Sequence, residues 1–450
     1  MASLDAVFKA YDVRGTYPDQ LDAELCRVIG AAFARFATEH DDATRILVAR
    51  DMRPSGVELS AAFAQGAMAQ GVDVVDIGLA STDLLYFAAG KLDAPGAMFT
   101  ASHNPAQYNG IKMCLSGAKP IGEESGLRDI KAMAQAGPAP GARTGSTSSA
   151  DLLTEFARHV QGFVDVGALR PLRVVADTAN GMGGLVVPAA FDGLPFELDL
   201  LYPELDGTFP NHPADPIQPE NQRDLIARVR ELGADVGLAF DGDADRVFLV
   251  DETGRGVSGS LTTALVAIEV LRVHPGATII HNLICSKAVP EVIREHGGLP
   301  VRTRVGHSFI KQVMGETGAA FGGEHSGHYY FRENWRADSG LIAAMFVLEA
   351  VSRSGRPLSE LLAPLDRYAA SGEINTKVHD APAVIERVAA AYAGHEQDRL
   401  DGLTVDLGTW WFNLRASNTE PLLRLNLEAP TPQECEARVR EVRALITQEA

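Results

Sequence analysis

Short apolar runs alternate with longer amphipathic stretches along most of the chain. The runs are centred on residues 46–49, 174–176 and 279–280, and each ends at a polar residue. Because both faces of such runs are apolar, they predict buried strands of parallel sheets. Candidate helices occupy residues 22–36, 56–70, 220–232, 260–271 and 339–351. This alternation of strand and helix predicts an α/β fold.

Three further apolar strands, rich in Ala and Gly, each run into a polar loop. They begin at Pro95 (PGAMFTASHNP), Gly233 (GADVGLAFDGDADR) and Gly318 (GAAFGGEHSGH). Their long and unequal spacing excludes a solenoid repeat but fits three α/β domains of one design. Ligands of open α/β sheets bind beyond the carboxyl ends of the strands, so we expect the three loops to face one cleft.

The domain organisation follows from length and from local composition. A chain of 450 residues predicts three domains, or four if one is small, at about 150 residues per domain. Residues 134–150 are rich in Gly, Pro, Ser and Thr and indicate a linker or long surface loop, where we place the first boundary. The predicted domains are residues 1–145, 146–255, 256–368 and 369–450.

The tail after Ser371 has a different pattern. It predicts a strand at residues 373–379, a helix from about Pro382, strands near 403–407 and 422–427, and a last helix. Thr431 and Glu434 have the spacing of a capping box at the start of that helix. These elements predict a small α+β domain.

Composition narrows the functional class. With 46% hydrophobic and 22% charged residues, the chain has the proportions of an ordinary folded protein. Its net charge of −19 disfavours nucleic acid and anionic membranes as partners, so an anionic substrate needs a locally basic pocket. Four scattered cysteines without a CxxC pair indicate neither a disulfide framework nor a thiolate zinc site. Without a signal-like segment or an apolar run of ~18 residues, we expect a cytoplasmic protein.

The first loop displays a potential nucleophile. Ser102 follows its strand directly, His103 is its neighbour, and Pro105 ends regular structure. Taken alone, the pair fits an ST-turn or a helix cap. Gly110 and Lys112 follow closely, however, so one segment can bring a hydroxyl, an imidazole and an ammonium together.

The second loop has the pattern of a metal site. Asp241, Asp243 and Asp245 alternate with small residues between two apolar strands, and three such carboxylates repel unless a cation gathers them. An EF-hand is a rival interpretation because Glu252 occupies its twelfth position, but Arg246 stands where that loop needs Gly. A solvated acidic loop is the other alternative. We favour Mg²⁺, which takes few carboxylates and completes its shell with phosphate or water.

Two later loops have polar side chains suited to a sugar phosphate. Residues 322–328 (GGEHSGH) combine flexible backbone with Glu324, Ser326 and two imidazoles, which suit adjacent sugar hydroxyls better than zinc, since no third ligand has a recognisable spacing. Residues 415–421 (RASNTEP) bring a guanidinium, hydroxyls and an amide into one turn, a pattern typical of a tetrahedral-anion site.

With these four motifs in this order, the chain resembles the α-D-phosphohexomutases, and among them the bacterial phosphomannomutase/phosphoglucomutase group. The resemblance covers nearly the whole chain. It implies three topologically similar α/β domains with mixed sheets and a smaller C-terminal α+β domain around a central cleft. The repeated strand and loop pattern agrees with this arrangement.

The resemblance also implies roles for individual residues. Ser102 is implied to carry the phosphate as phosphoserine and to complete the Mg²⁺ shell formed by Asp241, Asp243 and Asp245. The other catalytic candidates are Arg14, His103, Lys112 and His328, of which Lys112 resembles a general acid/base and His328 shares that role. The substrate-binding candidates are Tyr11, Arg246, His307, Glu324, Ser326, Arg415, Ser417, Asn418 and Thr419.

One position departs from the pattern of the family. Many relatives have Lys before the Cys-Ser of the third domain, whereas this chain has Ile284 there. The departure puts one sugar or phosphate contact in doubt, and Lys287 is the nearby candidate to replace it.

We expect a phosphomannomutase that interconverts mannose 1-phosphate and mannose 6-phosphate and acts on glucose phosphates too. The implied cofactors are Mg²⁺ and glucose 1,6-bisphosphate or mannose 1,6-bisphosphate as activator. The expected partner is a hexose phosphate, with no nucleic acid or membrane, and the chain is expected to be a monomer or weak homodimer. The alternatives are a phosphoglucomutase, a phosphoglucosamine mutase (in which we expect Gln in place of His325), a metal-dependent sugar phosphatase and a noncatalytic sugar-phosphate binder.

Overall fold

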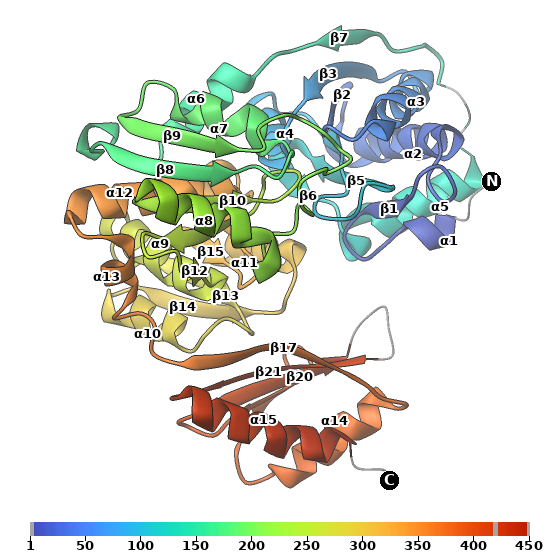
Figure 1. Cartoon of the computed structure of the whole chain (residues 1–450). Helices are drawn as coiled ribbons and strands as arrows, with labels where there is room; N and C mark the ends of the chain where they lie inside the picture. Colours follow the sequence, from blue (N-terminus) through green and yellow to red (C-terminus); the bar gives the residue numbers. More distant parts are fainter. Residues whose placement is uncertain (1–3, 138, 140, 417–421, 448–450) are drawn as a thin grey trace. The chain divides into compact units, whose positions relative to one another are not determined.

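The computed structural model describes residues 4–137, 139, 141–416 and 422–447, with the side chains of His307 and Ser308 outside this description. The chain divides into two compact units. The first unit comprises the residues up to Ser258 together with Ser326–Ser359, and the second comprises Gly259–His325 and the residues from Glu360 onward. Figure 1 labels the helices and strands.

The first unit contains a seven-stranded mixed sheet in the order β1-β5-β4-β2-β3-β7, with β6 beside β5. Its strands are β1 (Val13–Thr16), β2 (Arg45–Arg50), β3 (Asp73–Leu79), β4 (Gly96–Phe99), β5 (Tyr108–Leu115), β6 (Lys119–Pro120) and β7 (Thr147–Ser149). Its helices are α1 (Leu4–Val7), α2 (Ala23–Asp41), α3 (Ser55–Ala69), α4 (Thr82–Lys91) and α5 (Arg128–Ala136).

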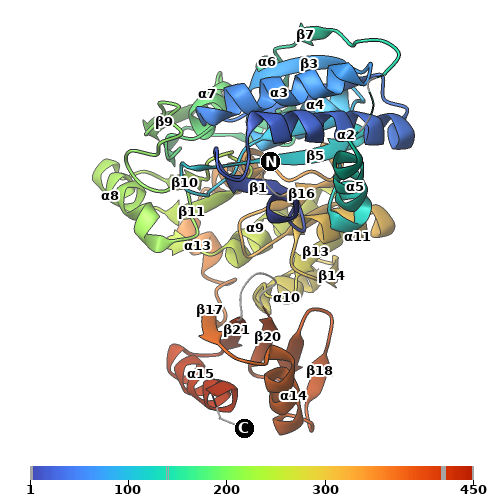
Figure 2. The same ribbon diagram turned by 90° about the vertical axis from the view of Figure 1, so that its right-hand side faces the viewer.

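Helices cover both faces of this sheet. Helices α2 and α3, which lie side by side in Figure 2, share a core with Ile46 and Val48 of β2. The alternate residues Leu47 and Ala49 are also buried, and α4 contacts β2, β4 and β5. Because successive residues of a strand point to opposite faces, α4 covers the second face. The carboxyl end of β4 therefore lies within a three-layer α/β domain.

A second mixed sheet of the first unit has the order β12-β11-β10-β8-β9. Its strands are β8 (Leu172–Asp177), β9 (Phe196–Leu201), β10 (Val236–Phe240), β11 (Val247–Asp251) and β12 (Gly256–Val257), with helices α6 (Leu153–Gln161), α7 (Gly183–Phe191) and α8 (Arg223–Leu232). Strand β8 is parallel to β9 and β10, and β11 returns antiparallel to β10. Strand β16 (Tyr329–Phe331) and helix α12 (Gly340–Ser354) also belong to this unit, and α12 contacts β10 and β11.

The second unit contains a parallel sheet in which β13 lies between β14 and β15. The strands are β13 (Thr278–Asn282), β14 (Leu299–Thr303) and β15 (Phe321–Gly323), with helices α9 (Gly259–Val273), α10 (Ala288–Glu295) and α11 (His307–Thr317); α13 (Leu358–Leu362) follows α12. Helix α11 contacts all three strands, while α9 contacts β15. The loop after β15 thus continues from the carboxyl end of a parallel strand.

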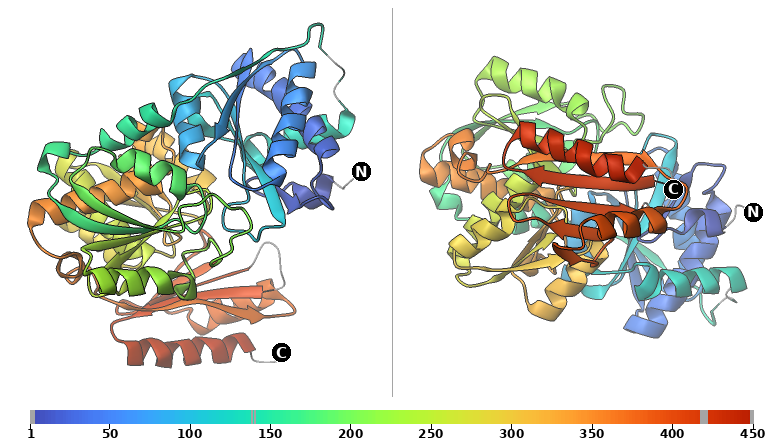
Figure 3. Two further views of the ribbon diagram at one scale, coloured as in Figure 1. Left: turned by 45° about the horizontal axis from the view of Figure 1, so that its top comes forward. Right: turned by 90° about the horizontal axis from the view of Figure 1, so that it is seen from below.

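The second unit ends with an antiparallel sheet in the order β17-β21-β20-β19-β18. Its elements are β17 (Ala369–Lys377), α14 (Ala381–Ala391), β18 (Glu396–Asp398), β19 (Leu403–Asp406), β20 (Trp411–Ala416), β21 (Leu422–Ala429) and α15 (Pro432–Thr447). Helices α14 and α15 pack on one face of the sheet around one apolar core, as the right-hand view of Figure 3 shows. The Glu434 backbone N–H donates to Thr431 Oγ1 (3.2 Å), which confirms the predicted cap.

The predicted α/β fold with a smaller α+β domain is confirmed, and the predicted parallel strands correspond to β2, β8 and β13. Asp22 and Ser339, the predicted first residues of two helices, are the caps of α2 and α12. The linker prediction for residues 134–150 was wrong in part, because Thr147–Ser149 pairs with β3 as an edge strand. The three boundaries between the four predicted domains stay predictions. Among the described residues, no helix combines the length and apolarity needed to cross a bilayer.

Candidate active site

Ser102 lies three residues beyond β4 in a constrained turn. Its backbone has a φ of 47°, in the left-handed region that residues with a side chain rarely adopt. The Ser102 N–H donates to Thr100 Oγ1 (2.9 Å), and the Ser102 hydroxyl donates to Asp241 Oδ2 (2.7 Å). The fold therefore brings the predicted nucleophile to the predicted metal loop, 139 residues away in the sequence.

The three aspartates of that loop are buried together between β10 and β11. Asp241, Asp243 and Asp245 are at most 1% exposed, and one oxygen from each lies within 4.8 Å of the others. Their burial rules out the solvated acidic loop. The EF-hand is ruled out as well, because strands flank the loop and the Glu252 carboxylate accepts from the N–H and hydroxyl of Ser359.

Two cations and a hydroxyl compensate the acidic cluster. Lys112 Nζ on β5 lies 2.7 Å from Asp243 Oδ2 and 2.6 Å from Asp245 Oδ2. Arg246 Nε donates to Asp241 Oδ2 (2.9 Å), and the Thr82 hydroxyl donates to Asp243. The cluster is thus held by contacts from three different elements of the first unit.

Burial and these cations act in opposite directions on the protonation of the site. Burial raises the pKa of Asp241, although Arg246 opposes it. Burial would also raise the pKa of Asp243, but Lys112 outweighs it and lowers that pKa. For Lys112 itself, burial favours the neutral amine, yet Asp243 and Asp245 raise its pKa well above the usual value. Lys112 is therefore a charged ammonium at neutral pH.

The donor set fits a hard divalent cation. Asp243 Oδ1 and Asp245 Oδ1 are buried and, among the described residues, have no hydrogen-bond partner. An unpaired buried carboxylate oxygen is costly, and a cation that accepts oxygen ligands removes this cost. The cluster therefore fits a metal site.

Gly242 lets the metal loop approach the serine. A Cβ at this position would lie 2.4 Å from the Ser102 carbonyl oxygen, closer than any side chain permits. Any other residue at position 242 would push the two loops apart.

His103 and Arg14 lie on the serine side of the cluster. His103 Nδ1 is 3.1 Å from Ser102 Oγ, and because the serine proton is donated to Asp241, the histidine N–H is the donor of this pair. Arg246, burial and Arg14 together lower the pKa of His103 to about 2, so the imidazole is neutral. Arg14 on β1 donates to Asn104 Oδ1 (2.7 Å) and pairs with Asp12.

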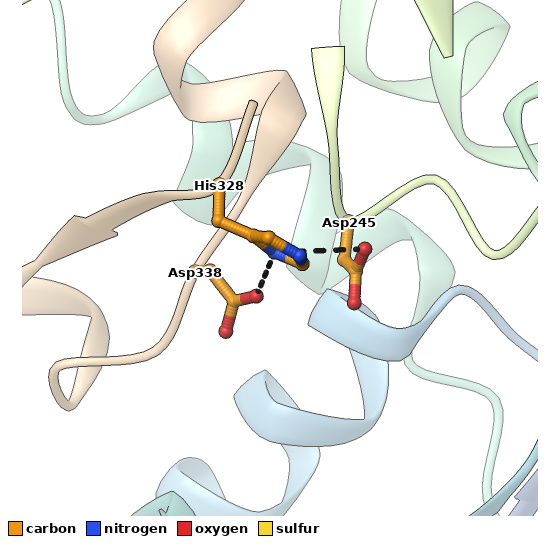
Figure 4. Close-up of side chains that lie close together, drawn as sticks. All are labelled: Asp245, His328 and Asp338. Carbon is orange, nitrogen blue, oxygen red and sulfur yellow. Dashed lines mark hydrogen bonds and ion pairs between the residues drawn. The ribbon is translucent and has the colours of Figure 1, made fainter. Parts of the chain in front are cut away.

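His328 belongs to a second acidic group of the first unit. Its Nδ1 lies 2.8 Å from Asp338 Oδ2 and 3.9 Å from Asp245 Oδ1, and Figure 4 shows these three side chains together. Burial would lower the pKa of His328, but Asp245 and Asp338 outweigh it and raise it. The pKa of His328 therefore lies above that of an ordinary histidine.

Arg246 has unused hydrogen-bonding capacity. Its Nη2 is buried without a hydrogen-bond partner among the described residues, and the nearest carboxylate oxygen, Asp215 Oδ1, is 4.0 Å away. A guanidinium that keeps a free N–H beside a nucleophile is suited to bind an oxyanion.

The second unit carries the third loop's carboxylate. Glu324 is buried directly after β15, and its Oε1 accepts from the Gly306 N–H (3.2 Å). Glu324 and His325 belong to neither metal-compatible group found among the described residues, whereas His328 of the same loop forms one such group with Asp245 and Asp338. Ser326 and Tyr11 are half-buried, and the side chain of His307 lies outside the described residues.

Ile284 and Lys287 lie where the chain departs from the pattern of the family. Ile284 is buried, while Lys287 Nζ donates to the Gly408 carbonyl (2.7 Å) and lies 3.3 Å from Asp406 Oδ1. Lys287 is thus engaged with the C-terminal domain, and its role in place of the missing lysine stays a prediction.

The C-terminal domain presents Arg415 at the end of β20. Arg415 Nη2 lies 3.1 Å from Glu373 Oε2, and Arg424 on the neighbouring strand lies 3.3 Å from the other oxygen of the same carboxylate. The predicted turn residues Ser417, Asn418 and Thr419 lie outside the described residues.

Several contact residues escaped the sequence analysis. Thr82, Asn104 and Glu373 each touch a predicted site residue from a distant part of the chain, and Asp338 touches His328 ten residues away. The only local signal was Ser81-Thr82-Asp83, which has the composition of a helix start but does not indicate a contact with Asp243.

The chain matches one protein family from end to end. This family is phosphoglucomutase/phosphomannomutase. Its alpha/beta/alpha domain I matches residues 5–138, domain II matches residues 154–255 and domain III matches residues 258–368. Its C-terminal domain matches residues 373–445. The chain is 42% identical to a protein named phosphohexose mutases from Xanthomonas campestris, covering 94% of each. It is 40% identical to a phosphomannomutase of Salmonella typhimurium, covering 98% of this chain and 99% of that one.

A comparison with solved structures finds the same family. A crystal structure of a phosphoglucomutase/phosphomannomutase family protein from Burkholderia thailandensis matches with a TM-score of 0.90 and 34% identity, covering 99% of this chain and 97% of that one. The class of protein is thus a mutase, an isomerase that transfers a phosphoryl group. The chain belongs to the phosphoglucomutase/phosphomannomutase family.

Proposed function

We propose that this chain interconverts mannose 1-phosphate and mannose 6-phosphate, and glucose phosphates likewise, through phosphoserine 102 and a hexose 1,6-bisphosphate. The observation that carries the proposal is the Ser102 hydroxyl 2.7 Å from Asp241, within a buried group of three carboxylates and two cations. Such a site concentrates charge around a transferring phosphoryl, where catalysis is mostly positioning and electrostatics.

The chemistry balances in two half-reactions. The bond between phosphorus and Ser102 Oγ breaks as a free sugar hydroxyl bonds to phosphorus, and that hydroxyl gives its proton to a base. The resulting bisphosphate turns over in the site. Its other phosphoryl then returns to Ser102 Oγ while the sugar oxygen released takes up a proton. The serine is phosphorylated again, and the phosphate has moved between C1 and C6.

Four side chains surround the reacting phosphoryl in this proposal. Arg14 and the unpaired Nη2 of Arg246 would bind its oxygens, and neutral His103 would donate its Nδ1–H to the same group. Lys112, held as an ammonium by Asp243 and Asp245, would add positive charge.

Asp241, Asp243 and Asp245 would hold Mg²⁺. When bound, the ion supplies neutralisation of the negative charge on the phosphoryl oxygens. The buried oxygens of Asp243 and Asp245 that have no hydrogen-bond partner support this assignment.

Proton transfer falls to Lys112 and His328. The carboxylates around His328 keep it protonated to higher pH than an ordinary histidine, which suits a general acid. Lys112 is charged in this structure, so its service as a base requires that its contacts with Asp243 and Asp245 weaken in the substrate complex.

The second unit and the segment next to it would bind the rest of the substrate. Glu324 and Ser326 would bind the 3- and 4-hydroxyls of the sugar, with Tyr11 and His307 as further contacts. Arg415, Ser417, Asn418 and Thr419 would bind the phosphate that is not reacting. None of these contacts involves the hydroxyl on C2 of the sugar, where mannose and glucose differ. The site would therefore accept both sugars.

A direct assay tests the proposal. The protein is incubated with mannose 1-phosphate, Mg²⁺ and a trace of glucose 1,6-bisphosphate, and the products are separated. Mannose 6-phosphate is the expected product. Free phosphate would show a phosphatase, and unchanged substrate would show a binder.

Ser102→Ala is the matched control of that assay. The variant should fold normally but lose turnover by several orders of magnitude, because it lacks the hydroxyl that carries the phosphoryl. Intact-mass analysis should find the added phosphate on the natural chain and not on the variant. Near-normal mutase activity of the variant would refute the role of Ser102.

A further inference from the structure

Arg53 is a fully buried arginine in the loop after β2. Its side chain is 0% exposed, as is that of its counter-ion Asp51. The Asp51 carboxylate accepts from the backbone N–H of Arg53 (2.9 Å) and from its Nε (3.2 Å). A buried guanidinium needs a partner for each of its five N–H groups, and Asp51 satisfies one of them.

The remaining four N–H groups all donate to the segment that carries Ser102. Nη2 donates to the carbonyl oxygens of Ser102 (3.0 Å) and Asn104 (2.6 Å). Nη1 donates to the carbonyl oxygens of Pro105 (2.8 Å) and Tyr108 (2.9 Å). One side chain thus fixes the backbone from the serine to the start of β5.

A second contact fixes the other side of the serine peptide. The Ser102 N–H donates to Thr100 Oγ1 (2.9 Å). Both backbone polar groups of Ser102 are therefore bound by side chains, the carbonyl by Arg53 and the N–H by Thr100. The left-handed backbone of Ser102 is unfavourable in energy, and these hydrogen bonds stabilise it.

We propose that Arg53 is a positioning residue for phosphoryl transfer, which with Thr100 fixes both backbone polar groups of Ser102 and thereby aims its Oγ at Asp241. The proposal rests on the function proposed above for Ser102. A reacting group displaced by about 1 Å can cost about 100-fold in rate, so the precision of this loop matters for turnover. Arg53 acts through the backbone of the loop and does not itself touch the reacting atoms.

A loop of the second sheet's domain closes over Arg53. The ring centroid of Phe209 lies 5.0 Å from Arg53 Cζ, and a Cβ at Gly207 would lie 2.6 Å from Arg53 Cα. This cover keeps water from competing for the four hydrogen bonds between Arg53 and the backbone carbonyls. These hydrogen bonds are stronger in such a buried environment than in water.

The test compares Arg53→Lys and Thr100→Val with a matched control, Arg230→Lys. Arg230 also donates to two backbone carbonyls, those of Thr253 (3.0 Å) and Gly254 (3.2 Å), in a turn without site residues. Lys offers three donors in place of five and lacks the planar fork, while Val removes the hydroxyl but keeps the shape. Mutase kinetics are measured at a temperature where circular dichroism shows each variant to be folded.

We expect kcat to fall about 30- to 100-fold in Arg53→Lys and about 10-fold in Thr100→Val, with KM for mannose 1-phosphate within about twofold of the natural value. Arg230→Lys should keep both constants. The ³¹P resonance of phosphorylated Ser102 should shift or broaden in the first two variants only, a change that lower stability alone does not cause.

The outcomes separate cleanly. Folded Arg53→Lys and Thr100→Val with kcat within twofold of the natural chain would overturn the proposal, as would an equal loss in Arg230→Lys. If Arg53→Lys does not fold, Thr100→Val decides by the same criterion. If the natural chain itself transfers no phosphate, the proposed function fails instead, so the two failures are distinguishable.

Discussion

Two charged regions of the molecule are built in opposite ways. In the first unit, Lys112 is 14% exposed and its partners Asp243 and Asp245 are at most 1% exposed. In the C-terminal domain, Glu373 is 29% exposed and its partners Arg415 and Arg424 are 14% and 31% exposed. Buried charge pairs are costly to break, whereas exposed pairs contribute at most about 1 kcal/mol.

The degree of burial determines what each region is suited to do. In the first region, buried carboxylates are held by paired cations, which suits chemistry that depends on position. In the second, a carboxylate neutralises two arginines on neighbouring strands, and a phosphate can displace so weak a pair. The same types of residue therefore favour preorganised catalysis in one place and exchangeable binding in the other.

Removing a charge from the buried region should have the largest effect. Asp243→Asn takes a formal charge from the metal site and leaves Lys112 with one carboxylate fewer. We expect kcat/KM to fall about 100-fold or more at low Mg²⁺, with part of the loss restored at high Mg²⁺. An Mg²⁺ titration of activity checks this.

Asp199→Asn is the matched control, since Asp199 pairs with Arg228 at 2.8 Å but is 29% exposed. It should leave the titration unchanged. An Asp243→Asn enzyme with the natural Mg²⁺ dependence would contradict the metal assignment.

A smaller effect is expected at the edge of the buried region, in the pH profile. Asp245 and Asp338 raise the pKa of His328 against the effect of burial. If protonated His328 is the general acid, kcat falls as pH rises through that pKa. Asp338→Asn removes one of the two carboxylates, so the fall should move to lower pH, with a loss of about tenfold at alkaline pH and little loss at acidic pH.

The raised pKa of His328 also makes the stability of the folded chain depend on pH. The protonated histidine stabilises the folded chain at acidic pH, and this contribution is lost as pH rises through the folded-state pKa. Asp338→Asn should therefore lower Tm more at acidic than at alkaline pH. An unshifted kcat profile in a folded variant would contradict the role of His328.

In the exposed region, Arg415→Ala tests binding. Loss of a charge-assisted hydrogen bond to phosphate should raise KM for hexose monophosphates about tenfold and also lower kcat, because the distal contact aligns the reacting hydroxyl. Arg415→Lys should recover only part of the loss, since a point charge replaces a two-pronged donor.

Free glucose provides the control for Arg415, because it has no distal phosphate. Its slow phosphorylation by the phosphoenzyme should be nearly indifferent to Arg415→Ala. If glucose reactivity falls to the same degree as mutase activity, Arg415 is structural.

The smallest effect is expected at Glu373, the shared counter-ion of Arg415 and Arg424. Glu373→Gln frees Arg415 and Arg424 from their internal counter-ion, at little cost because the pair is partly exposed. We expect KM for hexose monophosphate to fall about twofold, as steady-state kinetics can resolve. An increase in KM would mean that Glu373 holds Arg415 in its binding position.

Residues that carry their chemistry in a local pattern were predictable from the sequence. Ser102 follows an apolar strand, and the alternate spacing of Asp241, Asp243 and Asp245 indicates a shared cation before any fold is known. The fold class was predictable for a similar reason, because short apolar runs between amphipathic stretches identify buried parallel strands.

Residues that act through long-range contacts were not predictable. Asp338 reaches a predicted residue only because β16 returns it beside His328, and Arg53 meets the Ser102 carbonyl across 49 positions of sequence. Strand β7 was missed because its Thr-Ser-Ser segment has no apolar residue, and only its pairing with β3 makes it a strand. In each case the information lies in the pairing of distant segments.

The contact of Thr82 with the metal loop has a further consequence. Thr82 is the first residue of α4, and its backbone N–H donates to the Asp243 carbonyl (3.0 Å) while its hydroxyl bonds the Asp243 carboxylate. The positive end of the α4 macrodipole therefore faces the buried group of Asp241, Asp243 and Asp245. The N-terminus of α4 thus compensates part of the negative charge of the loop through the peptide backbone, in addition to the side-chain cations.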